Sequence, residues 1–142
     1  MADPAPGALR ATVAELEAVL SAARFVDPYG FRVRSCAPGV CELELPFHAS
    51  LERPGGIVNG IALMGAADVA MWLAIMTLRG TAEQWVTADL KTAFLKSGRS
   101  ENIVCTARVL KLGARSAYGA AECRASGADI LTHHVVTYLR AD

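Results

Sequence analysis

Residues Ile57–Leu78 read IVNGIALMGAADVAMWLAIMTL, an almost entirely apolar run that follows the tetrapeptide RPGG at 53–56. The run holds one carboxylate, Asp68, near its middle. Because it is apolar on every side of a helix, it predicts a helix that the rest of the molecule encloses. A carboxylate among Ala, Val and Met is costly to desolvate unless another group pairs with it or uses it, so Asp68 is a candidate functional residue.

The same run, at about 22 residues, is long enough to span a bilayer. Asn59, Asp68 and three breaks at small residues argue against a membrane span, and the flanks show no positive-inside asymmetry. We therefore expect the buried helix of a soluble protein and no membrane partner. Small residues along the helix would let a sheet or another helix approach closely.

Outward from this helix, the pattern changes to elements of a soluble α+β protein. Residues 8–24 carry apolar side chains at helical spacing, which predicts an extra N-terminal helix. Alternating apolar and polar residues predict two strands before the central helix and four after it. The expected fold is an antiparallel sheet wrapped around one long helix at about 57–78. The predicted strands are 31–36, 40–47, 83–96, 101–112, 115–125 and 129–140, with short breaks at 97–99, 112–114 and 126–128.

The length of 142 residues suits one domain, expected at 8–142 after a flexible N-terminus at 1–7. Hydrophobic residues make up 53% of the chain and charged residues only 20%, a balance that favours burial in a subunit interface. Fourteen basic residues balance fourteen acidic ones, and there is no run of Lys or Arg. These features argue against general nucleic-acid binding.

The four cysteines show no CxxC pair and no His at zinc-ligand spacing, so free thiols in a reducing cytoplasm are expected. A disulfide between Cys36 and Cys41 across the turn at 38–39 is conceivable but not required. The N-terminus lacks a basic segment followed by an apolar one, so we predict no secretory signal. His133 and His134 are neighbours on a strand and must face opposite sides, which excludes them as a metal pair.

Three segments together resemble the hotdog fold, specifically small acyl-CoA thioesterases of the phenylacetate-pathway and 4-hydroxybenzoyl-CoA type. The first, GGIVNGIALMGAADVAM (55–71), is similar to the family's glycine-rich start of the central helix followed by its catalytic Asp. The second, WVTADLKTAFLKSG (85–98), and the third, ARVLKLGARSAYGAAEC (107–123), resemble a strand and a hairpin of the family. The resemblance covers roughly residues 40–140. Where the family usually has His-Gly-Gly, this chain has Asn59-Gly60-Ile61.

The resemblance implies a catalytic set of Gly60, Asp68 and Thr87. The Gly60 amide, at the positive end of the helix dipole, would polarise the thioester carbonyl. Asp68 would be a general base for water or a nucleophile, and Thr87 would orient the water or the carboxylate. Gly60 and Asp68 are separated by about 12 Å along one helix, so the family arrangement implies a site shared by two antiparallel copies.

Further residues are candidates for substrate binding, each with an ordinary structural alternative. Asn59 caps the helix or orients the substrate, and Arg53 lies near the position of a family Asn. Met64 and Trp72 line an acyl tunnel or pack in the core. Asp89 is expected on the same strand face as Thr87, in a structural role. Basic residues that would contact the phosphates of coenzyme A, or be solvated, are Lys96, Arg99 and Arg115.

The sequence therefore predicts a cytoplasmic homo-oligomeric hotdog thioesterase that hydrolyses an acyl- or aryl-CoA to the free acid and CoA, without cofactor or metal. A dimer is the minimum, and a tetramer of two dimers is the family expectation. One alternative is a hotdog module that binds acyl-CoA without catalysis. A hotdog dehydratase or hydratase ranks lower because that chemistry generally uses a His, and the central helix has none. His48, in the loop before the helix, is a weak candidate to replace it.

Overall fold

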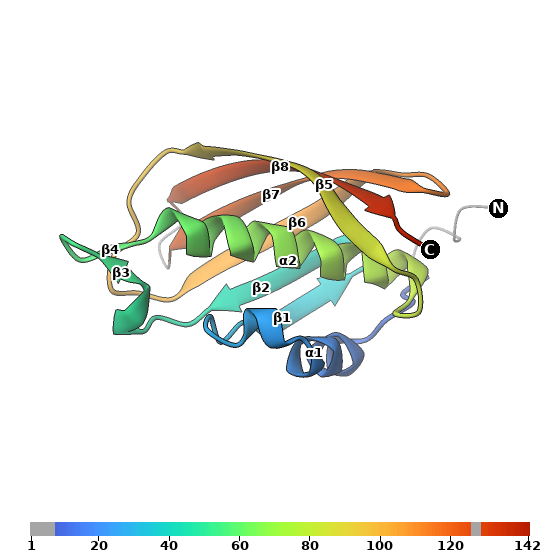
Figure 1. The fold of residues 1–142 in the computed structure, drawn as a ribbon, viewed down its shortest axis with the longest axis horizontal. Helices are drawn as coiled ribbons and strands as arrows, with labels where there is room; N and C mark the ends of the chain where they lie inside the picture. The colour runs from blue at the N-terminus through green and yellow to red at the C-terminus, as the bar shows by residue number, and fades with distance from the viewer. Residues whose placement is uncertain (1–7, 126–128) are drawn as a thin grey trace.

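The computed structural model describes residues 8–125 and 129–142. The expected flexible N-terminus at 1–7 and the expected turn at 126–128 lie outside these residues. A long helix, α2 (Gly60–Arg79), runs across the concave face of one antiparallel sheet (Figure 1). The sheet has six strands in the order β1-β2-β6-β7-β8-β5. They are β1 (Arg32–Ala37), β2 (Val40–Leu45), β5 (Trp85–Phe94), β6 (Ile103–Leu112), β7 (Ser116–Ala125) and β8 (Ile130–Arg140).

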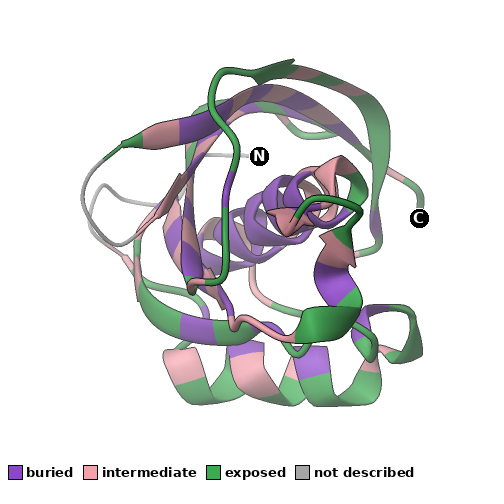
Figure 2. Ribbon diagram, turned by 90° about the vertical axis from the view of Figure 1, so that its left-hand side faces the viewer, coloured by how far each residue is buried: buried purple, intermediate pink, exposed green. Residues whose placement is uncertain are grey.

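This arrangement confirms the predicted α+β hotdog architecture. Seen along the helix axis, the sheet curves around α2 so that most of the helix surface is covered (Figure 2). Each strand falls inside or within one residue of its predicted range, because the alternation of buried and exposed residues that identifies a strand is a local property. Several predicted ranges extend two residues beyond the observed strand at one or both ends.

The central helix begins at Gly60 and not at Ile57, which corrects its predicted start. Asn59 is the N-cap, and its side-chain oxygen accepts a hydrogen bond from the backbone N–H of Ala62 at 2.9 Å. The preceding residues form a small hairpin that the sequence did not predict, with β3 (Glu52–Arg53) paired to β4 (Ile57–Val58). Its turn contains Gly55 and Gly56, both at positive φ, a conformation that glycine adopts without steric cost.

The N-terminal helix α1 (Val13–Ala22) is shorter than its predicted range of 8–24. Thr12 and Glu15 form a capping box that fixes its start, and a 3-10 turn at Arg24–Val26 follows it. The helix lies outside the sheet beside β1 (Figure 1). Glu17 accepts a hydrogen bond from the backbone N–H of Val33 at 2.7 Å, so α1 satisfies a backbone group of the edge strand β1.

Small residues let the sheet approach α2 closely. At Gly119 on β7, a Cβ atom would overlap with Met71 Cε and with the backbone oxygen of Arg108. The helix is long and apolar enough to cross a membrane, but most of it is buried inside the molecule. The buried fraction agrees with the prediction of a core helix.

One stripe of α2 is nevertheless open, and this corrects the expectation of a fully enclosed helix. Ile61 is 71% exposed, and the residues that continue its line along the helix are half-buried. Their spacing of three to four residues places them on one face. The open stripe lies next to β5, one of the two edge strands of the sheet. It consists of Ile61, Met64, Gly65, Asp68 and Trp72.

A β-bulge in β5 reverses the expected orientation of Asp89. Thr87 is opposite Tyr138 on β8, and Asp89 is opposite the very next residue, Thr137, so Ala88 is the extra residue. Tyr138 is buried toward the helix, and Thr137 faces the outer side. Asp89 therefore lies on the face opposite to Thr87, whereas strict alternation predicted the same face.

The four cysteines are free thiols. Cys36 and Cys41 are opposite each other on β1 and β2 but form no disulfide. Cys41 is fully buried, and burial raises the pKa of its thiol to about 12. The Cys41 thiol is therefore a neutral group in the core. The Cys36 thiol is half-buried.

Candidate active site

Asp68 is held by two hydroxyl groups that reach it from the sheet. Thr87 Oγ1 donates a hydrogen bond to Asp68 Oδ1 at 2.6 Å. Tyr138 Oη lies 2.8 Å from the same Oδ1 and 2.8 Å from the backbone oxygen of Asp68. The carboxylate is half-buried on the open stripe of α2, so it is both held in place and accessible from one side.

Tyr138 is a site residue that the sequence reasoning missed. It is directly opposite Thr87 in the pairing of β5 with β8 and is only 4% exposed. Burial, followed by the nearby charge of Asp68, raises the pKa of the Tyr138 phenol, which therefore keeps its proton at neutral pH. The alternation of apolar and polar residues in β8 places Tyr138 on the inward face of the strand. This pattern was the feature of the sequence that could have identified it.

The N-terminus of α2 presents free backbone donors. Asn59 caps Ala62 with its side-chain oxygen, and its side-chain nitrogen donates to the backbone oxygen of Leu51 at 2.7 Å. In the described part of the chain, no hydrogen bond occupies the N–H of Gly60 or Ile61. Helix N-termini carry such free N–H groups together with the positive end of the dipole. The arrangement can therefore stabilise an oxyanion.

Two pockets flank this end of the helix, with volumes of about 370 and about 410 Å³. Both are lined by Arg53, Gly60 and Phe94. The Phe94 ring lies against Gly60, where a Cβ atom would be 2.9 Å from Phe94 Cε1. The predicted residues that line one or both pockets are Arg53, Asn59, Gly60, Met64 and Lys96.

Two basic side chains, Arg53 and Lys96, line the first pocket. Lys96 lines it and forms an exposed ion pair with Asp129. The hydrogen bond and charge of that pair raise the pKa of Lys96 and lower that of Asp129. Arg99 lies close by and donates a hydrogen bond to the backbone oxygen of Gly55 at 3.0 Å. Lys96, Arg99 and Arg53 therefore gather at the same end of the molecule.

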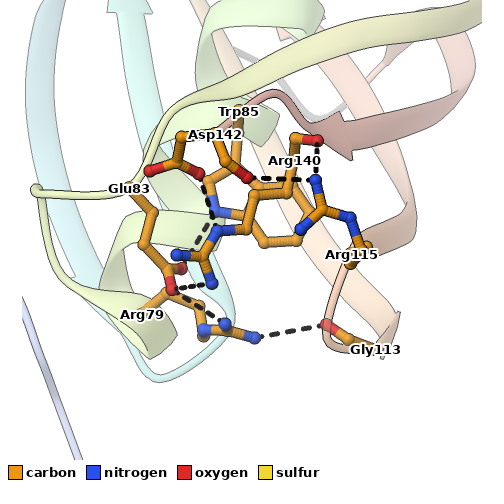
Figure 3. A network of polar contacts seen from close by, with 7 residues as sticks. All are labelled: Arg79, Glu83, Trp85, Gly113, Arg115, Arg140 and Asp142. Atoms are coloured by element: carbon orange, nitrogen blue, oxygen red, sulfur yellow. Dashed lines mark hydrogen bonds and ion pairs between the residues drawn. The ribbon is translucent and has the colours of Figure 1, made fainter.

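Arg115 lies apart from this group, at the opposite end of α2, in a network of charged side chains (Figure 3). It donates hydrogen bonds to the backbone oxygens of Arg140 and Asp142. Glu83 is the centre of the network and pairs with both Arg79 and Arg140. Burial would raise the pKa of Glu83, but hydrogen bonds from Arg79 and Trp85 hold this pKa below its ordinary value.

Trp72 is also separate from the pockets, since it lies on the open stripe beyond Asp68. Its ring is 6.0 Å from the ring of Phe25, which is 64% exposed. The structure thus divides the predicted site residues into two groups. Asp68 contacts Thr87 in the first group. The second group lines the two pockets and consists of Gly60, Arg53, Asn59, Met64 and Lys96. The structure leaves Arg115 and Trp72 outside both groups within one chain.

The histidines take no part in either group. His48 contacts Ser50 in the loop before the helix. His134 is fully buried between the hydroxyls of Thr92 and Thr132, and His133 faces the other side of β8. Among residues 8–125 and 129–142, no group of three or more His, Cys, Asp or Glu side chains could hold a metal ion.

Comparison with known proteins places this geometry in a family. The profile of the thioesterase superfamily matches residues 55–129, which include Gly60, Asp68 and Thr87. The chain therefore belongs to the thioesterase superfamily and is a hydrolase of that class, as the sequence predicted. The superfamily assignment made from the three segments is confirmed.

Individual relatives agree with this assignment. The chain is 30% identical over 104 residues to "Putative esterase SSO1253" of Saccharolobus solfataricus, covering 73% of this chain and 69% of the relative. Conserved protein PA5202 of Pseudomonas aeruginosa is 31% identical, with a TM-score of 0.79 over 84% of this chain and 94% of that one. The PaaI protein of E. coli, from the phenylacetic acid degradation operon, shares the fold at 16% identity, with a TM-score of 0.80 over 89% and 90% of the two chains.

Proposed function

We propose that the protein hydrolyses an acyl- or aryl-CoA thioester to the free acid and CoA, in an active site shared by two copies of the chain. The observation that carries this proposal is the separation of Gly60 from Asp68 on one helix. Eight residues of α-helix correspond to about 12 Å, too far for both groups to act on one carbonyl. Two antiparallel α2 helices would bring Gly60 of one copy to Asp68 of the other.

The chemistry needs only the groups described above. The thioester oxygen accepts a hydrogen bond from the free Gly60 N–H, which stabilises the negative charge that develops in the transition state. Asp68 either takes a proton from the attacking water or attacks the carbonyl carbon itself. A C–O bond forms, the C–S bond breaks, and the CoA thiolate takes a proton. This sequence requires no metal or cofactor.

Isotope labelling separates the two roles of Asp68. In a single turnover in ¹⁸O-water, a general base delivers the label directly to the product acid. A nucleophilic Asp68 whose anhydride is hydrolysed at the aspartyl carbon takes the label into its own side chain. Mass spectrometry of the peptide that contains Asp68 distinguishes these outcomes.

Two features of the single chain support a dimer. On the open stripe of α2, Ile61 is 71% exposed, and Phe94 of β5, which lines the same pocket, is 57% exposed, so apolar side chains of the helix and the edge strand are exposed together. Beside it, β5 is a ten-residue edge strand, whose packing partners in the described chain are β8 and α2. The other edge, β1, is flanked by α1. An uncovered edge of this length pairs readily with another strand, so a second copy would extend the sheet at β5 and cover the stripe. Further assembly to a tetramer remains a family expectation.

The substrate class rests on the pockets and their charges. Both pockets are lined largely by apolar side chains, as expected for an acyl group and a pantetheine arm. Arg53, Lys96 and Arg99 gather at this end of the molecule, where they would bind the phosphates of CoA. Arg115 lies at the far end of α2 in the same chain, so it could reach a substrate bound at Gly60 only as a residue of the second, antiparallel copy. An acyl- or aryl-CoA substrate and the free cysteine thiols together favour a cytoplasmic location.

The test is a pair of matched variants, Asp68→Asn and Asp89→Asn, assayed for release of the CoA thiol from a panel of acyl- and aryl-CoAs. We expect Asp68→Asn to lower kcat by about 10²–10⁴-fold, the usual contribution of a positioned acid or base. Asp89 lies on the outer face of the same sheet, so its variant should keep wild-type activity. Full activity of Asp68→Asn would contradict the proposal.

The same panel tests the two alternatives. Tight binding of acyl-CoAs without hydrolysis by the wild type would establish the non-catalytic module. Hydration of an enoyl-CoA without thiol release would establish the hydratase. The site does not favour the hydratase, because His134 is enclosed by Thr92 and Thr132 and His48 contacts the loop residue Ser50.

A further inference from the structure

We infer that Tyr138 is a positioning residue of the proposed thioesterase reaction, acting with Thr87 to hold Asp68 Oδ1 so that Oδ2 is the oxygen that acts on water or substrate. This inference rests on the proposed function. It extends that function to a residue 70 positions along the chain from Asp68 and outside the family match at 55–129.

The first argument is the concentration of hydrogen bonds on one carboxylate oxygen. Thr87 donates to Oδ1 at 2.6 Å and Tyr138 at 2.8 Å, and within the described residues no donor reaches Oδ2. Each hydroxyl donor occupies one of the acceptor lone pairs of Oδ1. Oδ2 therefore keeps its lone pairs for the reaction.

The second argument is that Tyr138 anchors Asp68 at two points. Its hydroxyl lies 2.8 Å from Oδ1 and 2.8 Å from the backbone oxygen of Asp68, so its single proton is shared between side chain and backbone. Asp68 alone could rotate among the staggered positions of its χ1 angle. Tyr138 is 4% exposed and lies on β8, which is paired on both sides, with β7 and β5, so it limits that rotation.

The third argument is that a β-bulge in β5 makes this contact possible. Thr87 and Phe94 are seven residues apart on β5, an odd spacing that puts them on opposite faces of a regular strand. The bulge at Ala88 changes this parity. Thr87 consequently reaches Asp68 opposite Tyr138, while Phe94 still reaches Gly60.

The test compares Tyr138→Phe with Tyr118→Phe. The first removes only the hydroxyl that contacts Asp68, and the second removes the hydroxyl of a 47% exposed tyrosine on the outer face. We expect Tyr138→Phe to lower kcat by about 10- to 100-fold with little change in KM, since misplacement of a reacting group affects the chemical step most. Tyr118→Phe should behave as wild type.

Thr87 variants keep the inference testable if Tyr138→Phe folds poorly. Since both hydroxyls hold the same oxygen, Thr87→Val should retain partial activity through Tyr138, and Thr87→Ser should restore it. If Thr87→Val is as inactive as Asp68→Asn, Tyr138 does not hold the carboxylate and the inference is wrong. Where Tyr138→Phe folds, the kcat of the double variant Thr87→Val with Tyr138→Phe, relative to wild type, should be lower than the product of the two single-variant ratios. Retention of wild-type kcat by folded Tyr138→Phe, with Asp68→Asn inactive, would overturn this inference and leave the proposed function intact. Activity of Asp68→Asn would instead overturn both.

Discussion

Asp68 shows how a charged residue can lie on an otherwise apolar helix. A buried unpaired carboxylate would cost several kcal/mol. Here one oxygen accepts two hydroxyl hydrogen bonds, and the side chain stays half-exposed on the open stripe of α2. Full burial would come only with a second copy of the chain, where the substrate would lie against it.

At the same scale, Cys41 gives the stability a pH dependence. Burial raises the pKa of this thiol from 9.0 to about 12 in the folded state, so between these values the unfolded chain loses its proton first. The stabilising effect is complete below about pH 9 and is lost as pH rises toward 12, by at most about 1.4 kcal/mol per pH unit. We expect the free energy of unfolding in urea to fall more steeply over this range in wild type than in Cys41→Ala. Parallel slopes would contradict this prediction.

At the scale of elements, the contact between α2 and β7 depends on the absence of a side chain at one position. Met71 and the backbone oxygen of Arg108 occupy the space that a Cβ on residue 119 would need. The methionine could move, but the carbonyl is fixed by the sheet. Gly119 therefore sets how closely the helix lies against the strands.

We expect Gly119→Ala to destabilise the protein by about 1–3 kcal/mol, the usual cost of overpacking. Thermal or urea unfolding measures this. Gly113→Ala is the matched control, because its Cβ would be 3.6 Å from Ser116, an ordinary van der Waals distance. Equal stability of the two variants would contradict this prediction.

At the scale of the whole molecule, the shared-site proposal predicts complementation between two inactive chains. Gly60→Val would place a side chain against Phe94 and block the free N–H, and Asp68→Asn would remove the carboxylate. A heterodimer of these variants keeps one intact site, made of Gly60 from one chain and Asp68 from the other. Differently tagged chains allow its purification, and we expect about half of wild-type activity per dimer.

If each site instead lay within one chain, the same heterodimer would have no intact site and no activity. Size-exclusion chromatography with light scattering provides the control, since both homodimers and the heterodimer should have the same mass. A monomer at micromolar concentration would contradict the shared-site proposal directly.

The sequence by itself determined the architecture and the candidate Asp68. An apolar run with small residues specifies a core helix, and alternation specifies the strands, because both periodicities follow from local backbone geometry. The resemblance carried by three segments then pointed to Gly60, Asp68 and Thr87. Residue order also indicated that Gly60 and Asp68 are too far apart on one helix.

Only the tertiary structure decided which groups meet. The bulge at Ala88, which reversed the face of Asp89, depends on how β5 fits both β8 and α2. The contact of Tyr138 with Asp68 and the separation of Arg115 from the pockets depend on strand order and register. These are long-range packing choices between residues far apart in sequence. Local periodicity carries no information about them, whereas it fully specifies the faces of a regular helix or strand.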